Sequence, residues 1–262
     1  YELGGVSYLV VNEDLLRQMI AEGDDVTKVV TSWVDYMGEM FKDAVNFNQD
    51  IGSWDVSNVE IFAHMFRNAT SFNQDIGSWD LGGSGNFGNR ELIEIEAMFF
   101  GASYFNQDIG SWDVSKIVRF DLIFHGASSF NQDIGSWDVS NMETMASTFK
   151  DASSFNQDLS SWDVSNVIYC EDFSLEATAW TEPKPTFTNC RVGNEIYLDE
   201  NGVTIKATEY AVVGESYELD GVSYSVVDLD LLLQMIAEGD DVTKVVTSNV
   251  NNMGEMVKWS VK

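Results

Sequence analysis

Apolar and polar positions along the chain recur with a fixed period. The stretch "FNQDIGSWD" stands at residues 47–55 and returns at 72–80, 105–113 and 130–138, with "FNQDLSSWD" at 155–163. The first positions of successive copies differ by 25, 33, 25 and 25, so the repeat has a 25-residue period and one copy is longer by eight. A period of this length is typical of a solenoid, in which each repeat stacks on its neighbours.

One unit, residues 51–75, predicts a short strand followed by a helical segment. Trp54 and Val56 alternate as strand residues do. From Val59 to Phe72 the apolar residues then follow at steps of 3, 3, 1, 3 and 3, which places them on one face of a helix or helical turn. A single unit would bury too little apolar surface to offset the entropy of ordering it, so we expect stability to come from stacking.

The phase of the repeat divides the chain into a solenoid and two flanking blocks. We expect coils to start at residues 26, 51, 76, 109, 134 and 159. They make up a solenoid over residues 26–183, and a Gly-rich surface insertion at 81–89 accounts for the longer copy. We expect residues 1–25 to form an N-terminal cap. Residues 184–262 are expected to form a second cap, which is also the start of the next tandem module.

A second, longer repeat links the two flanking blocks. Residues 1–42 return at 217–258 with 33 of 42 positions identical, so each position has its counterpart 216 places later. This duplication predicts a parent protein built from modules in tandem. Residues 1–24 correspond to the later block without its first hairpin, so we expect the chain to begin part-way through a module.

The later copy of this block predicts two hairpins and a helix. "EIYLDENGVTIKAT" at 195–208 alternates around Asn-Gly, and "ESYELDGVSYSVV" at 215–227 alternates around Asp-Gly, which is the signature of two β-hairpins. "DLDLLLQMIAEG" at 228–239 then predicts an amphipathic helix that Asp228 caps and Gly239 ends. Such a block would cover the apolar end of a stack of coils.

Charge excludes several classes of partner. Of 262 residues, 44% are hydrophobic, but 43 Asp and Glu stand against 14 Lys and Arg, a formal net charge of −29. We therefore expect no nucleic-acid partner, because phosphate contacts need cationic side chains. Membrane insertion is not expected either, because no apolar run approaches the roughly 20 residues needed to span a bilayer. Cys170 and Cys190 lie outside any C-x-x-C pair; a structural disulfide is favoured, and two free thiols are the alternative.

Stacking would align the repeated acids into columns along the solenoid. Their carboxylates can accept backbone N–H bonds in turns, and the alternative is calcium bridging between coils, since Ca²⁺ binds about six to eight oxygens. No EF-hand loop or G-G-x-G-x-D pattern is present, so turn bonding is favoured. The repeated amides, such as Asn48, Gln49 and Asn58, are expected to form ladders along the same turns. The calcium candidates are Asp50, Asp75, Asp108, Asp133, Asp158, Asp55, Asp80, Asp113, Asp138 and Asp163.

The repeated aromatic residues are expected to form a ladder in the core. A column of indoles would also suit stacking against sugar rings, but Trp54 occupies a position that points inward in leucine-rich repeats, which favours packing in the core. The core ladder is expected to contain Trp54, Trp79, Trp112, Trp137, Trp162, Phe47, Phe72, Phe105, Phe130 and Phe155.

Nothing in the pattern indicates an enzyme. His64 and His125 fall at different positions of their coils, where we expect solvated helix side chains, and neither lies at metal-ligand spacing. The repeated "GSW" serine has no G-x-S-x-G context. Gly83, Gly85 and Gly88 satisfy G-x-G-x-x-G, but they interrupt a coil instead of opening a βαβ unit, which favours a surface loop. We expect no catalytic residue and no cofactor except the calcium alternative.

"FNQDIGSWDVSNV", followed by "M..MF..A", resembles the leucine-rich-repeat relatives grouped around bacterial surface protein A. The resemblance covers about residues 26–180. Repeats of roughly 26 residues occur in that family in secreted or lipid-anchored bacterial surface proteins, including those of marine Bacteroidetes and mycoplasmas. It implies a location at the cell surface or outside the cell and a role in adhesion or recognition. This chain departs from the family pattern in its 25-residue period and its insertion.

We therefore expect an α/β solenoid, a leucine-rich-repeat-like right-handed coil of about six strand-plus-helix repeats with β-hairpin and helix caps. The expected function is that of a non-catalytic extracellular structural or adhesion module in a tandem-repeat cell-surface or filament protein, with head-to-tail assembly left open. The alternative is a recognition domain that binds a host protein or a glycan. The expected partners are other copies of the chain or neighbouring modules, with surface proteins or glycans as further candidates.

Overall fold

The chain forms two compact units, Tyr1–Cys190 and Arg191–Lys262. The structure is a computed structural model, and it describes residues 1–81, 93–190, 196–198, 205–207, 214, 216–219, 222–227 and 229–247. The Gly-rich insertion beyond Leu81, with its G-x-G-x-x-G glycines, lies outside the described residues, as do both hairpin turns and Asp228.

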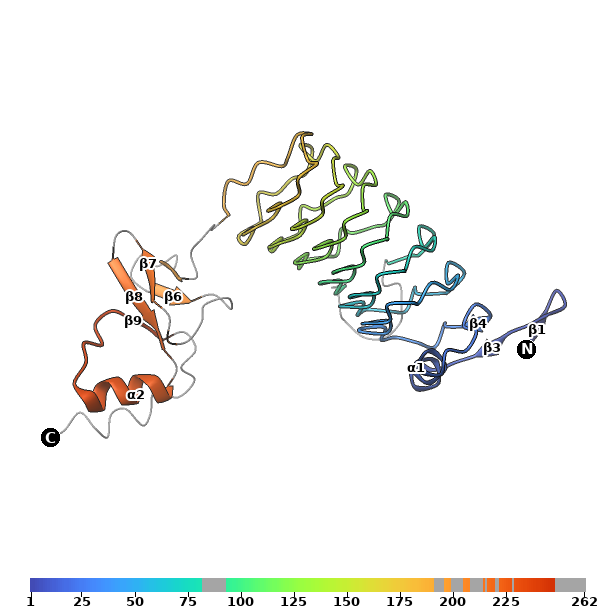
Figure 1. Ribbon diagram of the computed structural model, residues 1–262, viewed down its shortest axis with the longest axis horizontal. Coiled ribbons are helices and arrows are strands. Elements are labelled where there is room, and N and C mark those ends of the chain that lie inside the picture. The colour runs from blue at the N-terminus through green and yellow to red at the C-terminus, as the bar shows by residue number, and fades with distance from the viewer. Residues whose placement is uncertain are drawn as a thin grey trace. The chain divides into compact units, whose positions relative to one another are not determined.

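The first unit begins with short strands and one helix (Figure 1). Its elements are β1 (Glu2–Leu3), β2 (Val6–Ser7), β3 (Leu9–Val10), α1 (Glu13–Glu22) and β4 (Val29–Val30). β1 pairs antiparallel with β2, and β3 pairs parallel with β4 across the α1 connection. The Asn12 side chain accepts the Leu15 N–H at 3.0 Å and so caps α1, and Gly23 ends it with φ 77°.

The second unit repeats these elements and adds a hairpin before them. Its elements are β5 (Ile196–Leu198), β6 (Ile205–Ala207), β7 (Ser216–Leu219), β8 (Val222–Val226), α2 (Leu229–Glu238) and β9 (Val245–Val246). β5 pairs antiparallel with β6, and β7, β8 and β9 form a three-stranded sheet in that order. Both expected hairpins and the expected helix are therefore present. Within the described residues, neither helix is long and apolar enough to cross a membrane.

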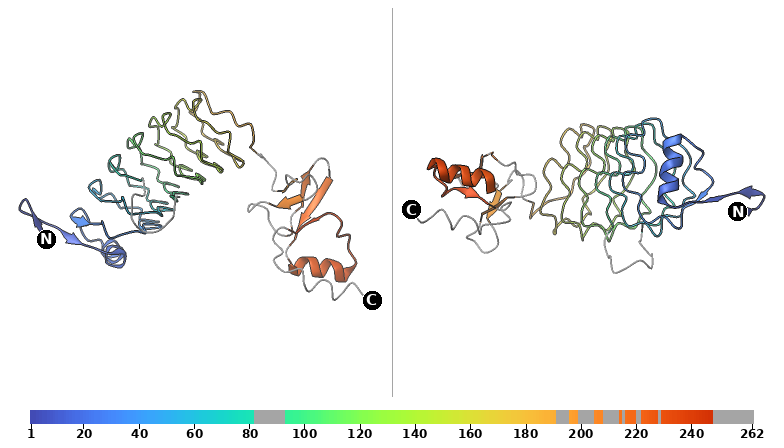
Figure 2. Two further views of the ribbon diagram at one scale, coloured as in Figure 1. Left: turned by 180° about the vertical axis from the view of Figure 1, so that it is seen from behind. Right: turned by 90° about the horizontal axis from the view of Figure 1, so that it is seen from below.

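Between α1 and Cys190 the chain winds as a stack of coils that lie side by side in each view (Figure 1 and Figure 2). Neighbouring coils meet in isolated parallel bridges, which join Tyr36 to Ile61, Ile61 to Glu94, Arg119 to Thr144 and Thr144 to Tyr169. The expected strand around Trp54 and Val56 is wrong: the bridge lies at Ile61, inside the segment expected to be helical.

The expected helical segment is also wrong, because its backbone bonds run in two directions. Phe62, His64, Phe66 and Asn68 donate their N–H groups to carbonyls of the next coil, at 2.7 to 2.9 Å. Met65 and Arg67 donate instead to the carbonyls three positions earlier, those of Phe62 and His64. In an α-helix each N–H beyond the first turn bonds to the carbonyl four positions earlier. The turns seen here instead leave alternate N–H groups free to bond to the next coil.

Two positions of each coil take up left-handed backbone to make these turns. The first has φ 52–60° and is filled by Glu39, His64, Ala97, Leu122, Ser147 and Asp172. The second has φ 57–68° and is filled by Asp43, Asn68, Gly101, Gly126, Asp151 and Glu176. Left-handed backbone is uncommon outside glycine, so bonding between coils must hold these residues in place.

The core is a double file of phenylalanine rings. Within a coil Phe66 stacks on Phe72 with ring centroids 4.0 Å apart, and Phe99 stacks on Phe105 at the same distance. Between coils Phe66 lies 5.6 Å from Phe99. All four rings are fully buried. The fold is thus a low-helix, mostly non-regular repeat solenoid around a regularly spaced aromatic core.

Candidate functional site

The repeated indoles connect each coil to the one before it. Trp112 is 4% exposed, and its Nε1–H donates to the Ile76 carbonyl at 3.1 Å. The same bond recurs from Trp54 to Val26, Trp79 to Ile51, Trp137 to Ile109 and Trp162 to Ile134. These side chains are therefore packed and bonded inside the stack, where no sugar ring can reach their faces.

The phenylalanines of the repeated motif form the second file of the core. Phe72, Phe105, Phe130 and Phe155 are fully buried, and Phe47 in the first coil is partly buried. Successive members lie 5.8 to 6.0 Å apart, as Phe130 and Phe155 do at 5.8 Å. The expected core ladder of indoles and phenylalanines is therefore present.

The repeated amides form a ladder on the surface, as expected. Asn106 Oδ1 accepts the backbone N–H of Asn131 at 2.9 Å, and Gln132 Nε2 donates to the same oxygen at 2.9 Å. The backbone bond recurs from Asn73 to Asn48, Asn106 to Asn73 and Asn156 to Asn131. A second ladder runs from Asn58, Asn141 and Asn166 to serine carbonyls of the preceding coil.

Both acidic columns lie in turns and accept hydrogen bonds there. Asp133 Oδ1 accepts the Gly135 N–H at 3.0 Å, and the equivalent bond recurs at Asp50, Asp75, Asp108 and Asp158. In the other column Asp138 Oδ1 accepts the Ser140 N–H at 3.1 Å and its hydroxyl at 2.6 Å. Asp55 and Asp113 each accept the same two bonds, from the N–H and the hydroxyl of the serine two positions later. Asp163 accepts the N–H of Ser165, and Asp80 also makes an interaction.

Where the donor is a serine side chain, these bonds favour the charged form of the carboxylate. The side-chain bond from Ser140 lowers the pKa of Asp138, and serine bonds lower the pKa of Asp113, Asp158 and Asp163 in the same way. The pKa of Asp55 is lowered first by the bond from Ser32. Within the described residues no three His, Cys, Asp or Glu side chains gather as a metal site requires.

Glycine lets adjacent coils approach closely beside the acidic column. A Cβ on Gly110 would lie 2.7 Å from the Asp133 carbonyl oxygen of the next coil. Gly52 and Gly135 meet the next coil in the same way, at 2.5 and 2.8 Å, and Gly77 does so as well. The last motif has Ser160 at this position, and there the preceding N–H, that of Leu159, donates to the Pro183 carbonyl.

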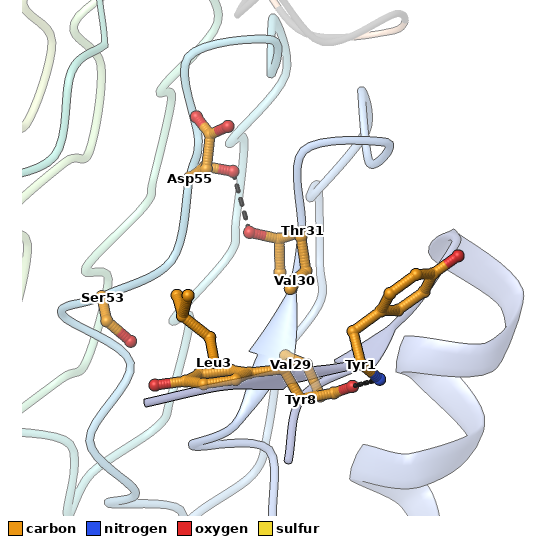
Figure 3. A pocket seen from close by; sticks show the side chains of 8 residues that line it. All are labelled: Tyr1, Leu3, Tyr8, Val29, Val30, Thr31, Ser53 and Asp55. Atoms are coloured by element: carbon orange, nitrogen blue, oxygen red, sulfur yellow. Dashed lines mark hydrogen bonds between the residues drawn. The ribbon is translucent and has the colours of Figure 1, made fainter. Parts of the chain in front are cut away.

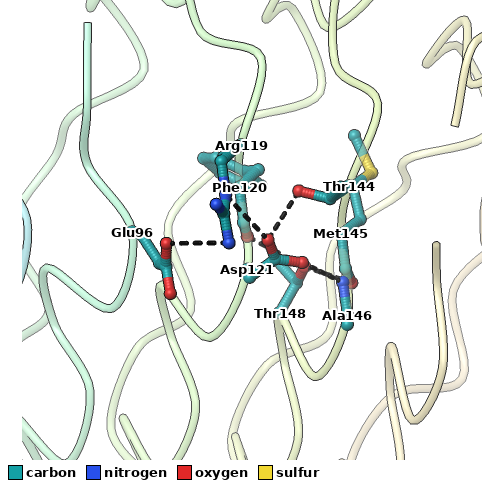
Figure 4. A network of polar contacts seen from close by, with 8 residues as sticks. All are labelled: Glu96, Arg119, Phe120, Asp121, Thr144, Met145, Ala146 and Thr148. Atoms are coloured by element: carbon teal, nitrogen blue, oxygen red, sulfur yellow. Dashed lines mark hydrogen bonds and ion pairs between the residues drawn. The ribbon is translucent and has the colours of Figure 1, made fainter. Parts of the chain in front are cut away.

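A buried polar network joins three coils near the middle of the stack (Figure 4). Asp121 is 1% exposed and accepts the Thr144 hydroxyl at 2.5 Å and the Ala146 N–H at 2.8 Å. Arg119 Nε lies 3.8 Å from Asp121, and Arg119 also pairs with Glu96 at 3.3 Å. Burial is the main effect on Asp121 and raises its pKa. An acid inside the apolar run "FDLIF" is the sequence signal for this network, which was not among the predicted sites.

Neither histidine is a solvated helix residue. His64 and His125 are half-buried, and the buried Nδ1 of each has no hydrogen-bond partner. Burial lowers the pKa of both. His125 Nε2 lies 3.4 Å from Asp151. The two imidazoles belong to different coils and positions, and they do not form a shared site.

A disulfide joins Cys170 to Cys190, with Cα atoms 5.8 Å apart. Cys170 is 6% exposed in a core position of the last coil, where earlier coils have Met, Phe or Ile. The bond ties the end of the first unit to its core. It closes a loop that contains Trp180, which is also buried.

An apolar hollow lies beside the N-terminal strands, which form two separate two-stranded sheets (Figure 3). Its volume is about 380 Å³. Tyr1 and Leu3, which line it, are 90% and 75% exposed. The hollow is lined by Tyr1, Leu3, Tyr8, Val29, Val30, Thr31, Ser53 and Asp55.

The repeated polar residues hold turns and neighbouring coils together, and the exposed ones present the same acidic and amide groups once per coil.

Two overlapping stretches, residues 13–89 and 84–187, match the family described as "Mycoplasma protein of unknown function, DUF285". No curated protein and no solved structure matches the chain. Because the two tandem matches cover more than half of the chain, it belongs to the DUF285 family.

Proposed function

We propose that this chain is a non-catalytic structural and adhesion module of an extracellular surface protein. The observation that carries the proposal is the repetition of one polar surface, coil after coil, on a stack bonded at every step. Asn131 and Asp133 in one coil stand where Asn106 and Asp108 stand in the coil before. Contacts made by such a surface would be multivalent, so weak identical contacts would gain strength from their number.

The disulfide supports a location outside the cytosol. Cys170 and Cys190 are bonded, and disulfides persist mainly in secreted and surface proteins. The repeat of residues 1–42 at 217–258 supports a parent protein with modules in tandem. We also propose that the solenoid is a relative of the leucine-rich-repeat coils of bacterial surface protein A-like proteins, with single bridges and turns in place of their strands and helices.

Labelling of intact cells tests the location. Antibodies raised against the purified chain are applied to cells of the source organism before and after permeabilisation. Label on intact cells, removed by external protease, is the expected result. Label that is found only after permeabilisation would rule out a surface role.

Bead retention tests the adhesive role. Beads coated with the chain at several densities are passed over surfaces coated with host-cell extracellular material or with the same chain. Retention should fall more steeply than coating density, because multivalent attachment needs several contacts at once. Beads that carry the heat-unfolded chain are the control, and equal retention of both kinds of bead would contradict the proposal.

A further inference from the structure

One position of the coil often holds a cationic side chain, although the chain as a whole is acidic. It lies directly before the second left-handed position, and in successive coils it is filled by Lys42, Arg67, Phe100, His125, Lys150 and Leu175. We call these six residues the variable column. The repeated nine-residue motif stays almost unchanged from coil to coil while this position does not, so stacking alone does not determine its side chain.

The middle of the variable column is a stack of three flat groups. The guanidinium carbon of Arg67 lies 4.6 Å from the centroid of the Phe100 ring, and the ring centroids of Phe100 and His125 are 4.6 Å apart. The three residues come from consecutive coils, so Phe100 is covered on both faces and meets solvent at its edge. A phenyl edge carries partial positive charge, and the guanidinium has its N–H donors in its plane. The exposed edge of this stack therefore favours an anion.

No carboxylate pairs with Arg67 in the part of the chain that the structure describes. The lysines of the same column are paired, Lys42 with Glu39 at 2.7 Å and Lys150 with Asp172 at 2.5 Å. The charge of Arg67 is thus stacked on a ring without an ion pair and is available to a partner.

The two left-handed positions beside the column carry no acid in the three coils of the stack. In the coils before and after, the same positions include Glu39, Asp43, Asp151 and Asp172. An anion therefore meets less repulsion beside the stack than beside the outer coils, although the net charge of the chain is −29. The acid-free positions are filled by His64, Asn68, Ala97, Gly101, Leu122 and Gly126.

Two further acids of these coils are engaged by Arg119. Glu96 pairs with it at 3.3 Å, and Asp121, which is 1% exposed, lies 3.8 Å from it (Figure 4). Asp151 lies 3.4 Å from His125 Nε2 and marks the border of the acid-free positions. Arg67 is therefore the cation of the stack that a negatively charged partner can pair with directly.

The backbone beside the stack is already used between coils. Asn68, Gly101 and Gly126 donate their N–H groups to the column carbonyls of the next coil at 2.7 to 2.8 Å. An extended peptide therefore cannot add there through main-chain bonds, and recognition is left to side chains. Hydroxyl groups follow the column in each of these coils and can exchange hydrogen bonds with the hydroxyls of a sugar. They belong to Thr70, Ser71, Ser103, Ser128 and Ser129.

We propose that the stack of Arg67, Phe100 and His125 is a binding site for an anionic glycan, a sugar chain that carries carboxylate or sulfate groups. Arg67 binds the anionic group through two parallel N–H bonds, and the edges of the two rings lie along the sugar. The proposal rests on the proposed adhesive function for its biological role, and it names the class of partner.

Titration with labelled glycans tests the site. The full chain is titrated into fluorescent fragments of heparin, which carry sulfate and carboxylate, and of hyaluronan, which carry carboxylate alone, and binding is followed by fluorescence anisotropy. We expect saturable binding of heparin, and binding of hyaluronan as well if a carboxylate is sufficient. Neutral dextran should not bind, and poly-glutamate should bind more weakly than the glycan. No binding of either anionic glycan, or equally tight binding of poly-glutamate, would overturn the proposal.

Variants locate the binding on the stack. R67A should weaken binding by about tenfold or more, because it removes the group that pairs with the anion. K116A is the matched control: it removes one positive charge from an exposed position of the same solenoid and should weaken binding by less than about twofold. R67K keeps the charge but not the planar donors, so its affinity should lie between those of R67A and the wild type. Equal affinities of R67A and K116A would show a general effect of charge and would overturn the site.

Thermal unfolding of each variant separates loss of binding from loss of folding. If R67A has a much lower Tm than the wild type, R67K and F100L provide the comparison, and each should bind more weakly than K116A. Wild-type affinity in both would overturn the site. Surface label and bead retention without glycan binding would remove this site and leave the adhesive role. Glycan binding by a chain that is found only inside cells would do the reverse.

Discussion

The pKa values of Asp138 and Asp121 are shifted in opposite directions. Column residues such as Asp138 are exposed and accept serine bonds that lower their pKa. Asp121 is buried, and burial raises its pKa although Thr144 and Ala146 donate to it (Figure 4). The same side chain is thus favoured as an anion in one place and as an acid in the other.

The raised pKa of Asp121 predicts a pH-dependent difference between wild type and D121N. The folded protein binds this proton more tightly than the unfolded chain does, so the stabilisation is complete below the unfolded pKa of about 4 and is lost as pH rises through the folded pKa. The amide of D121N does not titrate. The Tm of the wild type relative to D121N should therefore rise as pH is lowered from about 7 toward 4, measured by thermal unfolding.

D138N is the matched control and should respond with the opposite sign. The pKa of Asp138 is lowered, so its stabilisation is present above the unfolded pKa and is lost as pH falls through the folded pKa. The Tm of the wild type relative to D138N should fall as the solution is acidified below about pH 4. A difference for D121N that is flat with pH would contradict the burial argument.

The close approach at Gly110 predicts a large effect of one methyl group. In G110A the new Cβ would lie 2.7 Å from the Asp133 carbonyl, so two coils must separate locally. We expect a loss of about 1–3 kcal/mol in the free energy of unfolding, measured by urea denaturation. S160A changes the same position in the last motif, where a Cβ is already present, and should cost about 1 kcal/mol or less. Equal losses would show that contact with the next coil is not the cause.

The hairpins and the helices of the flanking blocks could be predicted from the sequence, but the turns within each coil could not. The period, the aromatic core, both hairpins and the amide ladders could be predicted, because each depends on which residues recur together. The sequence wrongly predicted a helix in each coil. The turns after Phe62, in which an N–H bonds to the carbonyl three positions earlier, give the same apolar spacing as one face of a helix. The apolar pattern therefore does not distinguish the two structures. Nor does the sequence reveal the left-handed positions, since one of them holds Glu39, His64 and Leu122 in different coils.

The bond from each indole to the preceding coil predicts the cost of W112F. Phenylalanine would leave the buried Ile76 carbonyl without its donor and would fill less of the core. We expect a loss of about 2–4 kcal/mol in the free energy of unfolding, measured by urea denaturation. W33F is the control, because Trp33 is 76% exposed, and it should change stability by less than about 0.5 kcal/mol. A cost for W112F as small as that of W33F would contradict the role of the indole in joining coils.

For the solenoid as a whole, stability resides in contacts between neighbours. Phe66 lies against Phe99 and Phe72 against Phe105, with centroids 5.6 and 5.9 Å apart, and backbone N–H groups bond each coil to its neighbours. Stability should then be a sum of similar terms, one per coil and one per interface. At the candidate site the amide ladders and the Asp columns could be predicted from the period, but the Asp121 network could not, because it depends on the Thr144 and Ala146 donors of the next coil.

Removal of one whole coil tests this view of the solenoid. Deletion of residues 51–75 joins Asp50 to Ile76 and restores "FNQDIGSWD", so Phe47 can stack on Phe105. This variant should fold cooperatively, with a lower Tm and a urea m-value for the solenoid reduced by about a sixth, because m follows the surface exposed on unfolding. Deletion of residues 51–63 removes less chain but shifts the phase, so rings and left-handed positions no longer align, and it should prevent cooperative folding. If the shorter deletion is tolerated as well as the longer one, the period does not set the packing of the coils.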